Sequence, residues 1–161
     1  MMEAIPENWF SWNFAVMEGT KRIADLDISS WREKGQLEVS GISFEIYREG
    51  LARGAFLLET NGSELAIAEK PGAFHRMFQI HHEDKQYTLR AKSAFSRKML
   101  LFMGSREIGS MSPQGLFTRK MVVDLPEKLP LPVRVFIIWL AMLLWKRDFE
   151  AGGTGGAVGA A

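Results

Sequence analysis

The 161-residue chain contains no cysteine, which excludes disulfide bridges, thiolate metal sites and cysteine nucleophiles. Its first stretch, Met1 to Trp12, holds two acids and no basic side chain. That stretch lacks the charged and apolar regions of a secretion signal, so we expect a cytoplasmic protein. The formal net charge is only +1, and no basic–aromatic run appears, so nucleic acid is not an expected partner.

Long hydrophobic runs are also missing, with one exception near the end of the chain, from Val135 to Trp145. An α-helix of that length spans about 16 Å, whereas a bilayer core of about 30 Å needs about 20 residues. Extending the run back to Leu129 brings in Arg134 and two prolines. We therefore predict a buried helix at about 133–147 and no bilayer-spanning segment.

Upstream of this helix, turn signals recur about every ten residues, and the runs between them are rich in aromatic and β-branched residues. Asn61-Gly62 is the clearest hairpin turn, because both residues tolerate a positive φ. No upstream segment keeps a helical period over three turns. Short strands at this spacing predict a sandwich or a barrel.

The chain also contains an internal similarity. Residues 56–80 align without gaps on residues 99–123, and six of the 25 positions are identical, among them Phe74 with Phe117 and Arg76 with Arg119. Either one strand–turn–strand unit is used twice around a single sheet, or two β-hairpins resemble each other by chance.

A helix that is apolar on all faces must be enclosed on all sides. At about 10–12 Å across, it is too wide for an eight-stranded barrel, whose own side chains fill the interior. Residues 10–128, at about ten per strand and turn, give about 12 strands. We therefore predict a mainly β fold: a closed antiparallel barrel of about 12 strands enclosing a C-terminal hydrophobic α-helix. This single domain would cover residues 1–150, and a disordered Gly/Ala-rich tail would follow at 151–161.

Several short segments carry a family resemblance over roughly residues 9–150. They are Gly54-Ala55-Phe56 with Gly62, Leu65 and Ala66, Tyr87-Thr88-Leu89, Ile108-Gly109, Phe117 with Arg119, and Leu129-Pro130-Leu131-Pro132. With this layout the chain resembles the tubby C-terminal-like superfamily, which includes tubby proteins, phospholipid scramblases and plant LURP-one-related proteins. It looks most like small, uncharacterised LURP-one-like members. The cysteine-rich, proline-rich and calcium-binding features of scramblases are missing, as is the ending of tubby itself. The resemblance implies a barrel around a central helix and no particular activity.

Catalysis and metal binding have no visible carrier in the sequence. The three histidines and nearby acids, His75, His81, His82, Glu83 and Asp84, match no metal motif, and the adjacent histidines would point to opposite faces of a strand. There is no G-x-S-x-G elbow and no phosphate-cradling glycine loop. We predict no catalytic residue, no metal and no cofactor, and hence a non-enzymatic binding or scaffold module.

The strongest functional signal is a basic segment, residues 85–120, which carries +7 of charge although the whole chain carries +1. Five of its cations are candidate ligands for anionic headgroups: Lys85, Arg90, Lys92, Arg97 and Lys98. Such a patch suits anionic phospholipid headgroups or a phosphorylated protein partner, at about 1 kcal/mol per cation near a membrane. The resemblance implies the same ligand class, since tubby domains bind phosphoinositides through a basic surface. The alternative is that these cations only solubilise the barrel and guard its edges.

A second functional hypothesis is a tail-anchored, scramblase-like membrane protein in which residues 129–145 insert into the bilayer. Trp145, beside Lys146 and Arg147, would then sit at the membrane interface, whereas in a barrel it would cover one end. The first hypothesis places the protein in the cytoplasm, peripheral at the membrane.

Overall fold

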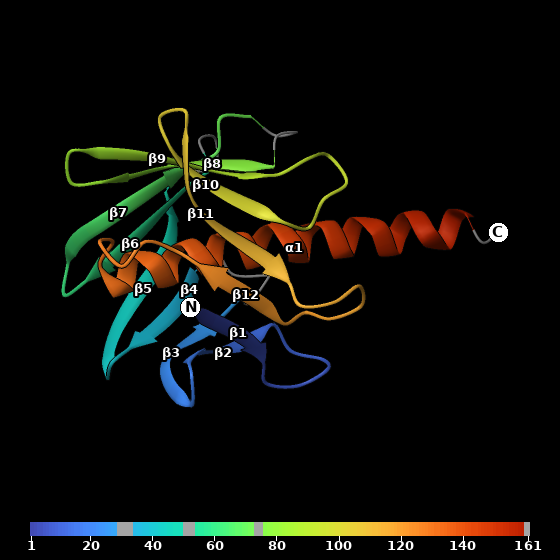
Figure 1. Ribbon diagram of the computed structural model, residues 1–161, viewed down its shortest axis with the longest axis horizontal. Helices are drawn as coiled ribbons and strands as arrows, with labels where there is room; N and C mark the ends of the chain where they lie inside the picture. Colours follow the sequence, from blue (N-terminus) through green and yellow to red (C-terminus); the bar gives the residue numbers. More distant parts are fainter. Residues whose placement is uncertain (29–33, 50–53, 73–75, 160–161) are drawn as a thin grey trace.

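The computed structural model describes the backbone of residues 1–28, 34–49, 54–72 and 76–159, and the side chains of these residues except Lys34 and residues 153–159. Its elements are β1 (Met2–Pro6), β2 (Asn13–Glu18), β3 (Lys21–Asp27), β4 (Lys34–Val39), β5 (Ile42–Glu49), β6 (Ala55–Thr60), β7 (Ser63–Glu69), β8 (Met77–His82), β9 (Lys85–Ala91), β10 (Met99–Met103), β11 (Arg106–Pro113), β12 (Met121–Asp124) and α1 (Leu131–Gly159). Each strand pairs antiparallel with its neighbours along the chain, and β1 pairs with β12 (Figure 1). The predicted closed barrel of about 12 strands with a C-terminal helix is confirmed.

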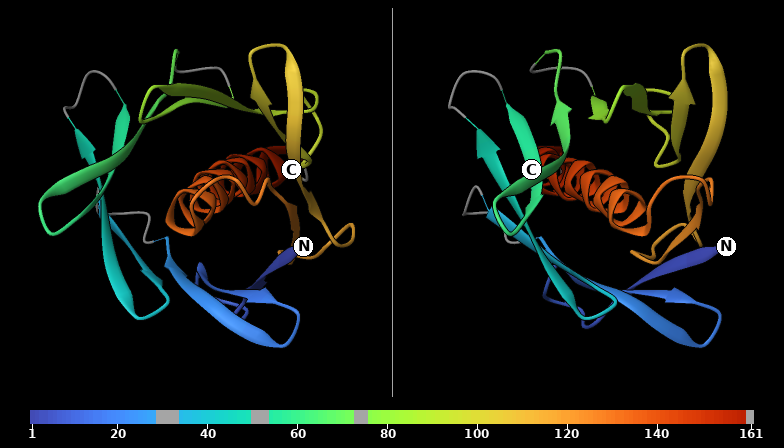
Figure 2. Two further views of the ribbon diagram at one scale, coloured as in Figure 1. Left: turned by 60° about the vertical axis from the view of Figure 1, so that its left-hand side comes forward. Right: turned by 90° about the vertical axis from the view of Figure 1, so that its left-hand side faces the viewer.

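The helix α1 runs through the barrel, with the sheet on all sides (Figure 2). Every residue from Val135 to Lys146 is buried, as the absence of a polar face requires. The strands supply the surrounding layer by alternation: Phe78 and Ile80 of β8 and Leu89 of β9 point inward and are fully buried. Among the described residues, no helix is long and apolar enough to cross a membrane.

The helix begins at Leu131, close to the predicted start, with Pro132 in its first turn. Its far end leaves the barrel and projects beyond the strands (Figure 1). The backbone continues as a helix to Gly159, beyond the predicted end at about residue 147. Side chains beyond Gly152 lie outside the described residues, and the disorder of 151–161 stays a prediction.

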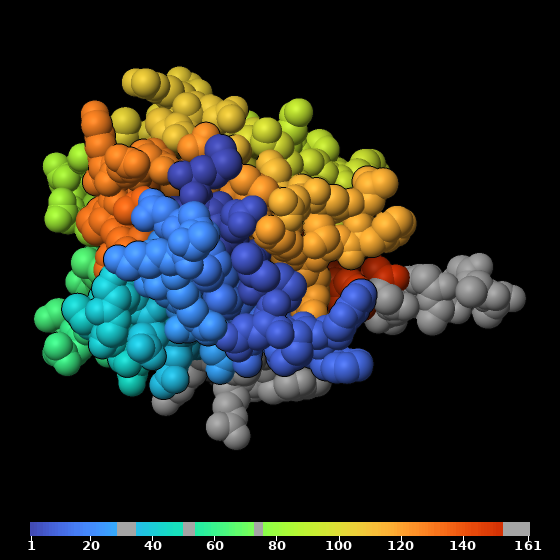
Figure 3. Space-filling view, turned by 60° about the horizontal axis from the view of Figure 1, so that its bottom comes forward, coloured from blue at the N-terminus to red at the C-terminus, as the bar shows by residue number. Residues whose placement is uncertain are grey.

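The two ends of the barrel differ in the length of their connections. At one end, tight turns join β2 to β3, β4 to β5, β6 to β7, β8 to β9 and β10 to β11. The Asn61-Gly62 turn is one of them, with both residues at positive φ as predicted. At the other end, longer loops connect the strands where α1 emerges (Figures 1 and 3). We call three of these loops, residues 7–12, 92–98 and 114–120, the open rim.

The internal similarity corresponds to a shared structural irregularity. A register shift lies between Leu58 and Glu59 in the β6–β7 hairpin and between Leu101 and Phe102 in the β10–β11 hairpin, at equivalent positions of the sequence alignment. The β2–β3 hairpin has the same shift between residues 16 and 17. Because a bulge bends and twists a strand, three of them at four-strand intervals help the sheet curve around the helix. This recurrence favours a repeated unit over a chance likeness.

The helix and the sheet approach each other closely at Gly35 of β4. A Cβ atom at this position would lie 2.8 Å from two indole atoms of Trp139 on α1. The indole cannot move aside easily, because its N–H donates to the Asp27 carbonyl at 3.0 Å and its ring meets Phe56 edge-on at 5.3 Å. Glycine is therefore what allows Trp139 to lie on β4.

The substitution Gly35→Ala is expected to lower the free energy of unfolding by about 1–3 kcal/mol, because the added methyl overpacks a fixed contact. Urea denaturation measures this loss. The control is Gly115→Ala, whose Cβ would meet only Thr118 Cγ2 at an ordinary 3.6 Å. In a Trp139→Leu background the cost of Gly35→Ala should shrink; an unchanged cost would show that the indole contact is not the cause.

Candidate functional site

Because α1 fills the barrel interior, candidate binding sites lie on the outside of the barrel. One hollow of about 470 Å³ opens on the outer surface beside β8 and β9. The described residues that line it are Arg76, Met77, Arg90, Ala91, Lys92, Ser93 and Ala94. They include three cations and no acid. We call this site the basic hollow.

Strand pairing places these residues together. Met77 of β8 pairs with Arg90 of β9, and one residue further the amide of Ala91 donates to the Arg76 carbonyl at 3.2 Å. Leu89 points into the core, so the exposed side chain of Arg90 faces outward, and alternation directs Lys92 outward as well. The hollow is thus built on the outer face of the sheet, at the end of β9 that adjoins the open rim.

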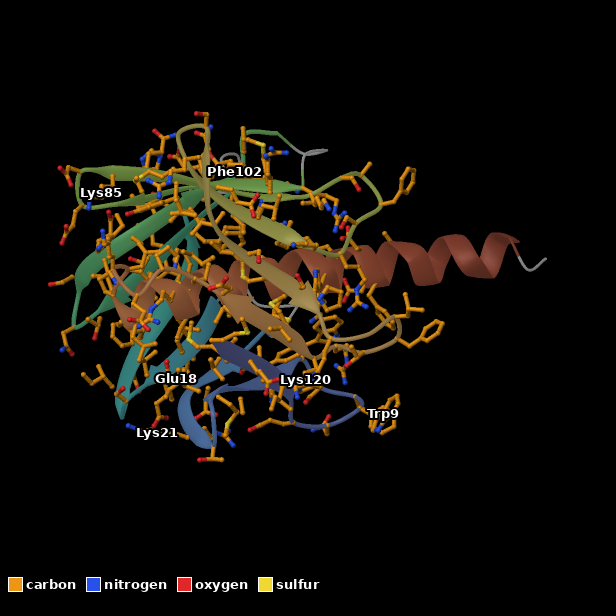
Figure 4. The ribbon with its side chains drawn as sticks, viewed as in Figure 1. Trp9, Glu18, Lys21, Lys85, Phe102 and Lys120 are labelled. Atoms are coloured by element: carbon orange, nitrogen blue, oxygen red, sulfur yellow. The ribbon has the colours of Figure 1, made fainter. Side chains whose placement is uncertain are left out.

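The structure brings a third predicted cation beside this pair. The Lys92 amide donates to the Lys98 carbonyl at 2.8 Å, which continues the β9–β10 pairing by one step. Met99 is fully buried, so Lys98 next to it faces outward on the same side as Lys92. Arg90, Lys92 and Lys98 therefore share one outer face, while Lys85 does not belong with them. Lys85 starts β9 beside a tight turn, at the opposite end of the barrel from Trp9 (Figure 4).

The predicted ligand Arg97 is already engaged by the protein. Its guanidinium donates to the carbonyls of Leu116 at 3.3 Å and Thr118 at 2.6 Å, and lies over the Trp145 ring at 4.4 Å from the centroid. The Trp145 indole N–H in turn donates to the Arg97 carbonyl at 2.8 Å. Burial lowers the pKa of Arg97 from its usual value. Arg97 thus fastens two rim loops to α1, and Trp145 is buried at the end of the barrel.

Two further arginines make the same kind of contact. Arg76 donates to the carbonyls of Ala94 at 3.3 Å and Ser96 at 3.0 Å, and also forms an ion pair with Asp148 of α1 at 2.5 Å. It therefore ties the loop 92–98 to both β8 and the helix.

Arg119 makes the third contact of this kind, beside the β1–β12 pair that closes the barrel. Its guanidinium donates to the carbonyls of Ser11 at 2.6 Å and Asn8 at 2.5 Å, and lies 5.3 Å from the Trp12 ring centroid. We call Arg76, Arg97 and Arg119 the arginine clasps. Each precedes an even-numbered strand and holds two carbonyls of the next rim loop, a use that suits the planar fork of guanidinium donors.

The sequence alone marked Arg97 as a candidate headgroup ligand and predicted no loop-holding role for Arg76, Arg97 or Arg119. One available signal pointed to their role, since the internal alignment pairs Arg76 with Arg119. Within the described residues, no group of three or more acids or histidines is placed to hold a metal ion. His82 is buried with Nδ1 at 2.8 Å from the Leu65 carbonyl, His81 pairs with Ile67 of β7, and His75 is outside the described residues.

Comparisons of the chain with known protein families, with curated proteins and with solved structures found no match. The tubby-like resemblance therefore stays a prediction that rests on layout.

Replacing one clasp tests whether these contacts stabilise the rim. Arg97→Lys is expected to lower the free energy of unfolding by about 1–3 kcal/mol, because lysine cannot serve two carbonyls and an indole face together. Chemical denaturation measures the loss, and faster proteolysis within 114–118 should accompany it. The adjacent cation provides the control, since Lys98→Ala should change stability by less than about 0.5 kcal/mol. Equal effects at both positions would contradict the clasp.

Proposed function

We propose that this protein is a non-enzymatic module that binds anionic phospholipid headgroups at the basic hollow, peripherally at the cytoplasmic face of a membrane. The observation that carries the proposal is the gathering of Arg76, Arg90 and Lys92 around one outward hollow whose described lining contains no acid. Lys98 adds a further cation beside it.

Two of these cations are available to a ligand. Arg90 lies over the Phe102 ring at 4.4 Å from the centroid, which orients its guanidinium plane. Within the described part of the chain, neither Arg90 nor Lys92 is recorded in an ion pair. Guanidinium binds phosphate oxygens bidentately, lysine adds a point charge, and the Ser93 hydroxyl next to Lys92 can donate a further hydrogen bond. Arg76, held by Asp148, lines the site without leaving its loop.

The chemistry of the hollow fits binding better than turnover. The described residues of its lining offer cations and one hydroxyl, but no carboxylate or histidine that could act as a base beside them. The barrel interior, where a substrate would otherwise be enclosed, is occupied by α1. These features support a docking surface for an anion.

The position of α1 favours peripheral attachment over a tail anchor. Inserting residues 129–145 into a bilayer would require the buried face of Val135 to Trp145 to leave the core that the sheet forms around it. The barrel would then expose its whole apolar lining to water, at a cost comparable to unfolding. The structure therefore supports attachment through the surface.

Vesicle co-sedimentation tests the proposal. We expect binding to phosphatidylcholine vesicles that contain phosphatidylserine, loss of most binding at high salt, and little binding to phosphatidylcholine alone. The pair Arg90→Glu/Lys92→Glu should weaken binding by roughly tenfold or more, since each lost cation is worth about 1 kcal/mol.

The matched control reverses two charges at the tight-turn end, Lys85→Glu/Arg106→Glu, which changes the net charge equally. An equal loss in both pairs would show diffuse attraction and contradict a hollow-centred site. Equal or absent binding to both kinds of vesicle would overturn membrane binding, and capture of a soluble phosphopeptide instead would identify a phosphorylated partner.

A further inference from the structure

We propose that the open rim inserts aromatic loop tips into the bilayer interface, so that the barrel stands on the membrane by the end from which α1 emerges. The inference rests on the proposed lipid binding and adds to it the contacting surface, its orientation and an apolar contribution to attachment. The proposed occupant is the interfacial layer of a membrane that contains anionic lipid.

Among the described residues, the strongly exposed aromatic side chains all lie at this end of the barrel. Trp9, Phe10, Phe95, Leu116 and Phe117, all in the rim loops, are between 87 and 99% exposed. Phe149 is also exposed, and lies on α1 at 6.1 Å from the Trp12 ring beside the loop 7–12. Figure 4 shows Trp9 at the tip of its loop, directed away from the barrel. Large apolar side chains gathered at one surface mark a contact with another apolar phase.

The opposite end lacks this feature. Among the described residues at that end, the exposed large apolar side chains are Met1 at the start of the chain, 77% exposed, and Ile42 and Met103, each about half exposed. None of them is aromatic. The apolar tips are therefore a property of the rim and not of loops in general.

The arginine clasps explain how the tips are presented. Arg76 holds the carbonyls on either side of Phe95, and Arg97 holds those on either side of Phe117. Arg119 holds the carbonyls of Asn8 and Ser11, which flank Trp9 and Phe10. In all three loops the backbone is pulled toward the barrel and the aromatic side chain points out. Fixing the loops in advance removes most of the ordering entropy that insertion would otherwise cost.

The cations beside the aromatic tips favour an anionic membrane over a purely apolar partner as the occupant of this surface. Lys92 and Lys98 lie at the two ends of the loop that carries Phe95, and the basic hollow opens beside it. The rim acid Glu7 forms an ion pair with Arg22, which also pairs with Asp25. Aromatic side chains with adjacent cations suit the headgroup level of an anionic bilayer, where rings and charges are both accommodated.

The surface among the tips is apolar as well. A hollow of about 330 Å³ between α1 and the loop 114–120 is lined largely by aromatic and aliphatic side chains, including Trp12, Phe117, Trp145 and Phe149. Figure 3 shows the loops 7–12 and 114–120 close to the emerging helix. The exposed aromatic side chains therefore surround this largely apolar hollow.

Site-specific labelling tests insertion directly, since the native chain has no cysteine to interfere. Ala94→Cys, next to Phe95, and Ser105→Cys, in the β10–β11 turn at the far end, are each labelled with a polarity-sensitive fluorophore. On adding phosphatidylcholine–phosphatidylserine vesicles, the Ala94→Cys label should shift to the blue and be quenched by nitroxide-bearing lipid. The Ser105→Cys label should stay in water.

A substitution pair measures the apolar contribution. Phe95→Ala/Phe117→Ala should weaken vesicle binding roughly tenfold or more, and most of the binding that survives at high salt should disappear. The matched control Ile42→Ala/Met103→Ala removes exposed apolar groups from the other end and should leave binding unchanged. Thermal unfolding of both pairs checks that neither variant is misfolded.

The outcomes separate this inference from the proposed function. Vesicle binding with neither label entering the bilayer would overturn insertion and leave headgroup binding intact, and so would an unchanged affinity of the Phe95→Ala/Phe117→Ala pair. A fluorescence shift at Ala94→Cys that depends on protein concentration and not on lipid would overturn it in favour of self-association. Absence of any vesicle binding would overturn both proposals.

Discussion

Enclosure of a helix without a polar face is the constraint on which the rest of this structure depends. From Val135 to Lys146 every side chain of α1 is buried, so the sheet has to close, and it has to be wide enough for a helix with side chains. Where α1 lies close to a strand, a strand side chain would collide with it, and Gly35 beneath Trp139 avoids this collision because it has no side chain. The bulged hairpins, spaced four strands apart, supply curvature for the same closure.

Filling the interior moves any binding site to the outside, and the topology then makes the two ends unequal. Tight turns at one end leave little backbone to carry function, whereas the longer loops at the open rim can display side chains. The helix also leaves the barrel at the open rim, where the buried Trp145 contacts Arg97 and the exposed Asp148 pairs with Arg76. The candidate site is therefore a consequence of where the core element exits.

Periodicity and length were sufficient to predict the barrel, because an apolar helix too short for a bilayer and strands of regular spacing admit few arrangements. The proximity of Arg90 and Lys92 is consistent with strand alternation, since the two residues are two positions apart, at the end of β9 and just beyond it. The contacts of Arg97 could not be predicted from the sequence, because its carbonyl partners, Leu116 and Thr118, belong to a different loop. The exposed aromatic tips could not be predicted for a related reason. A phenylalanine near a turn can be buried or exposed, and the path of the loop backbone decides which.

Arg76 links the basic hollow and the aromatic tips structurally. Its guanidinium lines the hollow, holds the carbonyls that flank Phe95 and pairs with Asp148 on α1. A headgroup at Arg90 and Lys92 would thus lie beside a loop whose apolar tip is already positioned by the core helix. In the proposed mode of binding, electrostatic attraction would act over about a Debye length, and apolar contact would act only at the interface itself. Because the same arginine sets the geometry of both, the spacing between the charged and apolar contacts is fixed before the protein meets its ligand.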